Sequence, residues 1–131
     1  LSFCDDGDEY SIGYATDTGY VTDAMRENFK NCFAAVIESN HDVDMLREGP
    51  YPAELKQRIK SKKGHLSNAD CAEFAAELYS SGTRHIMLAH LSEENNDPSL
   101  AYNEVFSSIA DENVDLKVAT QDSAVRLFWE E

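Results

Sequence analysis

The chain has 131 residues, of which 42% are hydrophobic and 27% are charged, a length and composition that predict one globular domain. Its formal net charge of −14 argues against general binding to nucleic acid, because an acidic surface repels phosphate. No apolar run approaches the roughly 20 residues of a membrane-spanning helix, and the first residues lack the basic and apolar segments of a signal peptide. We therefore expect no contact with a membrane.

Three cysteines, Cys4, Cys32 and Cys71, lie far apart in the sequence and form no CxxC pair. This spacing argues against a disulfide framework and against a zinc site built from thiolates. It predicts reduced cysteines that pack in the interior, and it favours a cytoplasmic location.

The chain begins with the pattern of a β-hairpin followed by a helix. Residues 1–4 and 10–16 are the predicted strands, and the DDGDE segment between them is rich in turn-forming residues. Thr22 is the expected N-cap of the helix, because its hydroxyl can accept from a backbone N–H of the first turn. Met25 and Phe29, four residues apart, lie on the face that should pack inward.

A buried strand and a basic helix follow. The continuous apolar run 33–39 is typical of a strand covered on both faces. Pro52 suits the first turn of a helix that points Leu55 and Ile59 inward and ends near Gly64. Five of the eleven basic residues occur within eight positions in or just after this helix: Lys56, Arg58, Lys60, Lys62 and Lys63. This patch can hold a phosphate, but the pattern alone favours a solvated helix face.

The next helix is capped by Ser67 or Asn68 and ended by Gly82. Its apolar stripe at helical spacing consists of Cys71, Phe74, Ala75, Leu78 and Tyr79. After it, the apolar start of HIMLAHLSEENN (85–96) predicts a buried strand.

The last third of the chain predicts one more helix and two strands. Asp97 caps the helix, which begins at Pro98. Its expected inward face consists of Tyr102, Val105 and Ile109. Residues 116–120 and 125–130 are the predicted strands. Because strands alternate with helices along the chain, we expect an α/β domain with a layered sheet.

Polar residues follow three of the predicted strands directly: Asp17, the segment 38–42 and His90. In an open α/β sheet, sites form outside the carboxyl ends of the strands, so that these three ends can converge on one pocket. Aspartate and histidine are ligands that Zn²⁺, Mn²⁺ and Fe²⁺ accept. A carboxylate can bridge two ions, and a bound metal can lower the pKa of a water molecule to about 7, which generates a nucleophile.

His65 lies between the end of the basic helix and the start of the next one. A helix N-terminus favours an anion, because of its unpaired amides and its dipole. Together, these residues indicate a metal-activated hydroxide that faces a phosphate. Taken alone, a residue such as Asp17 is more often a turn or cap residue, and one such as His90 is more often a hydrogen-bonded structural residue.

Four segments, in this order, resemble the C-terminal half of a metallo-β-lactamase-fold hydrolase: ATDTG (15–19), ESNHD (38–42), GHLSN (64–68) and LAHLSEENN (88–96). They are most similar to the YycJ-like or WalJ-like branch of bacterial proteins, with ribonuclease Z as a more distant relative. The resemblance covers nearly the whole chain. It implies an α/β fold class, as the C-terminal half of a four-layer αββα sandwich with a dinuclear metal site at one edge of the sheets.

The resemblance also implies roles for individual residues. It makes Asp17 the carboxylate that bridges the two metals and His90 a terminal ligand of one of them. His65 matches a histidine that, in related nucleases, contacts the scissile phosphate and assists the leaving group. Further substrate contacts are expected from Lys63, Ser67 and Asn68. Orientation of the metal ligands is expected from three residues of ESNHD, a segment typical of the branch: Glu38, Asn40 and His41.

The family signature HxHxDH, which supplies most of the metal ligands and lies N-terminal to these motifs, is absent from the chain. We therefore expect residues 1–131 to be a single domain that is the C-terminal piece of a longer hydrolase. Its two ligands cannot hold two divalent ions, Zn²⁺ or Mn²⁺, so that the isolated chain should be inactive. The inner face of its sheet would pack on the missing N-terminal half, and without that half we expect a homo-oligomer.

For the parent protein, the longer hydrolase from which this piece would come, the sequence favours a phosphodiesterase or nuclease that acts on DNA. His65 and the basic run support this hypothesis because both suit a phosphate. A hydrolase of another ester or a thioester on the same scaffold is the alternative, since fold does not fix substrate. A third hypothesis is a non-catalytic acidic module that binds a partner protein, which the net charge and the missing ligands support.

Overall fold

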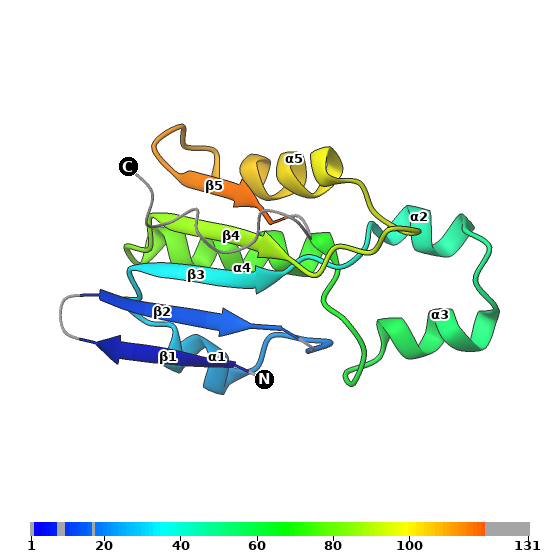
Figure 1. The fold of residues 1–131 in the computed structure, drawn as a ribbon, viewed down its shortest axis with the longest axis horizontal. Coiled ribbons are helices and arrows are strands. Elements are labelled where there is room, and N and C mark those ends of the chain that lie inside the picture. The colour runs from blue at the N-terminus through cyan, green and yellow to red at the C-terminus, as the bar shows by residue number, and fades with distance from the viewer. Residues whose placement is uncertain (1, 8–9, 17, 120–131) are drawn as a thin grey trace.

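The structure, a computed structural model, describes residues 2–7, 10–16 and 18–119 of the chain. These residues form one five-stranded sheet, in the order β1-β2-β3-β4-β5, and five helices (Figure 1). The strands are β1 (Ser2–Gly7), β2 (Tyr10–Ala15), β3 (Ala34–Glu38), β4 (His85–Ala89) and β5 (Asp115–Val118). The helices are α1 (Asp23–Asn28), α2 (Val43–Glu48), α3 (Ala53–Lys60), α4 (Asn68–Ser80) and α5 (Pro98–Ile109).

The sheet combines one antiparallel pair with a parallel run of strands. β1 and β2 form the predicted hairpin, and β2, β3, β4 and β5 are parallel to one another. The carboxyl ends of the four parallel strands therefore meet at one edge of the sheet, and α2 and α3 lie beyond that edge (Figure 1). The expected α/β fold class is confirmed, and the arrangement is consistent with one half of an αββα sandwich.

The hydrophobic core lies between one face of the sheet and the helices α1, α4 and α5. Ala35 and Ile37 of β3 point into this core and are fully buried. The rings of Phe29 and Phe74 join α1 to α4, with their centroids 5.3 Å apart. Burial of one such ring stabilises the fold by about 2–3 kcal/mol. The core therefore holds the helix layer firmly against the strands whose ends carry the polar motifs.

Most of the predicted helix starts are confirmed by the structure. In three of the predicted helices a capping oxygen accepts a hydrogen bond from a backbone N–H of the first turn, and the capping residues are Thr22, Ser67 and Asp97. The sequence analysis does not predict α2, although Asp42 caps this helix by accepting from the Met45 amide. The predicted strand 125–130 lies outside the described residues.

Two residues predicted to point inward are exposed. Leu55 is 39% exposed, because α3 lies beyond the sheet and buries only Ile59. Tyr102 is 36% exposed, because α5 turns Ala101 and Val105 toward the core instead. Both errors come from assigning a helix face by apolar spacing without knowing which side the sheet occupies.

The cysteines divide into two kinds. Cys71 is a free thiol, and its complete burial raises its pKa to about 12, so that it is an inert packing residue as predicted. Cys32 is disulfide-bonded, so the prediction of reduced cysteines is wrong for this residue. The cysteine pattern therefore no longer supports a cytoplasmic location. Within the described residues, no helix is both long and apolar enough to cross a membrane.

Candidate active site at the strand ends

The ESNHD segment (38–42) lies between two other motifs at the carboxyl edge of the sheet. On one side, the Ser39 amide donates to the Ala89 carbonyl at 2.9 Å. On the other side, the Asn40 amide donates to the Leu66 carbonyl, also at 2.9 Å. Backbone hydrogen bonds thus join ESNHD to both GHLSN and LAHLSEENN. With the Thr18 amide, which donates to Glu38 at 3.4 Å, the structure brings together residues of all four motifs on which the resemblance depends.

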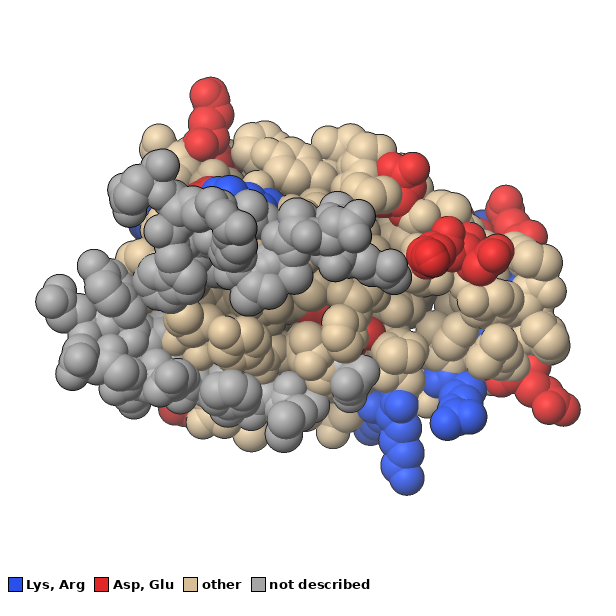
Figure 2. All heavy atoms as spheres, in the orientation of Figure 1, with Lys and Arg blue, Asp and Glu red and all other residues tan. Residues whose placement is uncertain are grey.

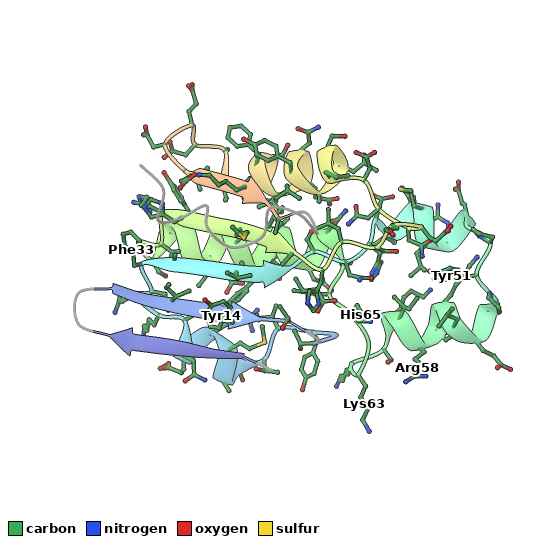
Figure 3. All side chains as sticks on the ribbon, in the orientation of Figure 1. Tyr14, Phe33, Tyr51, Arg58, Lys63 and His65 are labelled. Atoms are coloured by element: carbon green, nitrogen blue, oxygen red, sulfur yellow. The ribbon has the colours of Figure 1, made fainter. Side chains whose placement is uncertain are left out.

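Glu38, the last residue of β3, forms a pair with His65, whose position is labelled in Figure 3. The Glu38 side chain is completely buried, and its Oε2 lies 2.6 Å from Nδ1 of His65, whose side chain is 38% exposed. The other oxygen, Oε1, accepts from the Thr18 amide at 3.4 Å. When Glu38 is ionised it can only accept, so that Nδ1 of His65 is then the donor. This orientation leaves Nε2 of His65 for a second partner.

A separate network of buried amide groups lies behind this pair. The Ser39 hydroxyl donates to Oδ1 of Asn68 at 2.6 Å, and Nδ2 of Asn68 donates to Oδ1 of Asn96 at 2.8 Å. Nδ2 of Asn96 completes the ring by donating to the Ser39 carbonyl at 2.9 Å. Such a network is stabilising only when all its members are satisfied, as they are here. It fixes the start of α4 relative to β3.

Asn40 connects the two remaining histidines of the strand ends. Its Nδ2 donates to the His90 carbonyl at 2.9 Å, and its Oδ1 lies 3.2 Å from Nδ1 of His41. His41 is 2% exposed, and its burial, together with the nearby His65, lowers its pKa and favours the neutral ring. His90 has a φ of 59°, a left-handed conformation that is uncommon for a residue with a side chain. Asn40 thus holds the backbone of His90 in this turn.

A cavity of about 270 Å³ opens next to His65 on the side of α3. Its walls combine apolar and basic groups: Leu55, Arg58, Ile59, Lys63, Gly64 and His65. Gly64 is required there, because a Cβ atom would lie 2.2 Å from the carbonyl oxygen of Ile59. Figure 3 shows Arg58 and Lys63 extending from α3 and from the turn that follows it.

The predicted metal ligands are not assembled by the described residues. Asp17 lies outside them, and His90 alone is described. Among residues 2–7, 10–16 and 18–119, no group of three or more His, Cys, Asp or Glu side chains is placed to hold a metal ion. The donor set of the described part does not fit a metal centre by itself.

Two of the predicted substrate contacts take part in the architecture instead of facing a cavity. The Ser67 hydroxyl caps α4 by accepting from the Asp70 amide, and Asn68 is fully buried in the amide network. Three residues of this site are given no role by the sequence: Thr18, Ser39 and Asn96. All three lie within the four motifs of the resemblance, and no other feature of the sequence indicates that they belong to the site.

The site therefore belongs to an α/β domain that presents a carboxylate-bound histidine at the carboxyl ends of parallel strands. No family model matches the chain. It is 50% identical over 90 residues to exodeoxyribonuclease YycJ of Bacillus anthracis, an alignment that covers 69% of the chain and 34% of the relative. It is 44% identical over 115 residues to exodeoxyribonuclease WalJ of Streptococcus pneumoniae serotype 2 (strain D39), which covers 85% of the chain and 43% of that relative.

The chain is thus similar over most of its length to proteins of the YycJ-like and WalJ-like type, as its four motifs predicted. It spans between a third and a half of the length of these relatives.

Proposed function

We propose that the parent protein is a metal-dependent exodeoxyribonuclease and that this chain forms the wall of its active site that receives the scissile phosphate. The proposal extends to this chain the activity in the names of its relatives. The observation that carries it is the Glu38–His65 pair beside a cavity lined by Arg58 and Lys63. A histidine held by a carboxylate, together with two cations, suits an anionic phosphodiester better than a neutral thioester.

His65 is the residue of this chain to which we assign direct contact with the substrate. Glu38 holds Nδ1, so that Nε2 is the ring nitrogen that can bind the substrate. When a phosphate approaches, the buried carboxylate stabilises the positive charge of a protonated ring, as the acid of a catalytic triad does. The Nε2 proton can then bind a phosphate oxygen or pass to the leaving oxygen. Glu38 is a positioning residue, because it acts through His65.

The two divalent ions of the parent, Zn²⁺ or Mn²⁺, would supply the activated hydroxide when bound. In this proposal Asp17 and His90 would be among the residues that hold the two ions, while the remaining ligands would come from the N-terminal half of the parent. Asn40 donates to the backbone carbonyl of His90, and His41 contacts Asn40, so that both would help to orient His90. Residues 1–131 are then a single domain of a longer hydrolase, and the isolated chain is inactive because its ligand set is incomplete.

The other predicted substrate residues divide by exposure. Lys63 is exposed and lines the cavity, which supports a direct contact with a phosphate oxygen. Ser67 and Asn68 are 8% and 0% exposed, which favours a supporting contribution: they hold the backbone that carries His65. We also propose a cytoplasmic location, which rests on DNA as the substrate.

The test is Mn²⁺-dependent hydrolysis of a 5′-phosphorylated DNA duplex by the full-length parent. The wild type should be active, Asp17→Ala should be inactive, and His65→Ala should lose roughly 100- to 10,000-fold in rate, as expected for a proton donor. A wild type that binds metal but does not cleave DNA would favour an ester or thioester substrate. A wild type that binds no metal would favour the acidic interaction module.

A further inference from the structure

The basic run of the chain forms an uncompensated positive edge. Figure 2 shows blue side chains gathered along the lower edge of the view, where α3 and the turn after it lie. The sequence has four cations in this stretch: Arg58, Lys60, Lys62 and Lys63. None of the four forms an ion pair with a carboxylate of the described residues, although the chain has 25 acidic residues. A solvated helix face in so acidic a chain would be expected to pair at least some of its cations.

An exposed aromatic ring lies against this edge. Tyr20 is 44% exposed, compared with 36% for Tyr102, another exposed aromatic residue. The Nζ atom of Lys62 lies over its ring, 5.2 Å from the ring centroid. The cation occupies one side of the ring, so that the remaining ring surface is open to a ligand.

The ring is held in place by two tightly joined loops. The Gly19 amide donates to the Lys62 carbonyl at 3.2 Å. A Cβ atom at position 19 would lie 2.0 Å from the carbonyl oxygen of Ser61, so that only glycine permits this approach. Both loops also contact Glu38: its side chain accepts a hydrogen bond from the Thr18 amide in one loop and binds His65, which follows the other. Tyr20 and Lys62 are thus fixed relative to the residue that we assign to the scissile phosphate.

An exposed aromatic ring among unpaired cations is the combination that binds single-stranded nucleic acid, because bases stack on the ring while cations bind the phosphates. We propose that Tyr20 and Lys62 form a platform on which a base of a DNA single strand stacks, while Arg58 and Lys63 contact the phosphates of that strand. This inference rests on the proposed nuclease function. The platform leads the strand toward His65, and its contacts do not depend on base sequence.

The test compares Tyr20→Ala, Tyr20→Phe and Tyr20→Leu in the full-length parent. Binding of a fluorescent oligo-dT of about 12 nucleotides is measured by anisotropy in EDTA. The Ala and Leu variants should bind roughly 5- to 100-fold more weakly, which is the effect of removing one stacked base. The Phe variant should bind as the wild type does. Because Leu retains an apolar side chain, it replaces Ala if the Ala variant does not fold.

Two controls separate the platform from other effects. Tyr102→Ala removes a similarly exposed tyrosine on α5, away from the basic edge, and should leave DNA binding unchanged. Hydrolysis of bis(p-nitrophenyl) phosphate with Mn²⁺ should also be unchanged in the Tyr20 variants, because this small diester does not reach the platform. If the wild type binds and cleaves DNA while Tyr20→Leu binds it equally well, the platform is wrong. If the wild type neither binds nor cleaves DNA, the proposed function fails together with the platform.

Discussion

Replacing Glu38 with Gln tests the central pair of the site without changing the volume of the side chain. Both carboxylate oxygens of Glu38 accept, one from Nδ1 of His65 and one from the Thr18 amide. A glutamine amide offers one oxygen and one NH₂ group, so that His65 either faces the NH₂ group with its Nδ1–H or changes tautomer and accepts at Nδ1. The lost charge assistance, together with an unmet donor or a changed tautomer, should cost about 1–3 kcal/mol of folding stability.

A loss of activity of comparable size is expected in addition to this loss of stability. A histidine that loses its orienting carboxylate typically loses roughly 10- to 100-fold in activity, and we expect this factor in kcat/KM for DNA at a temperature where Glu38→Gln is fully folded. Asp115→Asn is the matched control. It changes a second histidine–carboxylate pair, in which Nδ1 of His85 lies 2.8 Å from Asp115, at the amino ends of β4 and β5. Equal kcat/KM values for the two variants would refute the role assigned to Glu38.

Three further predictions concern the rest of the molecule. Asn68→Ala should destabilise the fold by about 2–4 kcal/mol in denaturant titration, because it leaves the buried Ser39 and Asn96 groups without partners; a loss below about 0.5 kcal/mol would contradict the network. Burial lowers the pKa of His41 in the folded protein. As the pH falls below about 6.5, His41 therefore binds a proton in the unfolded chain before it does so in the folded protein. Stability should therefore decrease on acidification, by up to about 1.4 kcal/mol per pH unit, and His41→Gln should flatten this dependence in thermal melts between about pH 5 and pH 8. The isolated chain should self-associate, since half of a sandwich leaves a sheet face uncovered; a single monomeric species in light scattering would contradict this.

The sequence predicts the elements well where a local signal is sufficient. Caps such as Thr22 and Asp97, and the apolar runs of β3 and β4, contain enough information within a few residues to define an element. The inward faces of α3 and α5 depend on where the sheet lies relative to each helix, which no local pattern encodes. The exposure of Leu55 therefore could not be predicted.

The candidate site is predicted only in part, for a similar reason. Resemblance identified His65 and Glu38 as members of motifs, but expected Glu38 to orient a metal ligand. The partner of Glu38 in the structure is His65, which is 27 positions away in the sequence. A contact over such a separation depends on the crossover that carries α2 and α3 out beyond the sheet and returns the chain at His65.

The alternation of a strand explains why ESNHD begins with two different polar residues. Successive side chains of a strand point to opposite faces, so that Glu38 lies on the side of Val36 and Ser39 on the side of Ile37. Ile37 faces the helix layer, and Ser39 accordingly bonds to Asn68 at the start of α4. Glu38 faces the other way and binds His65. Changes at position 39 should therefore act through stability, while a conservative change at position 38 should lower both the stability and the rate of the reaction.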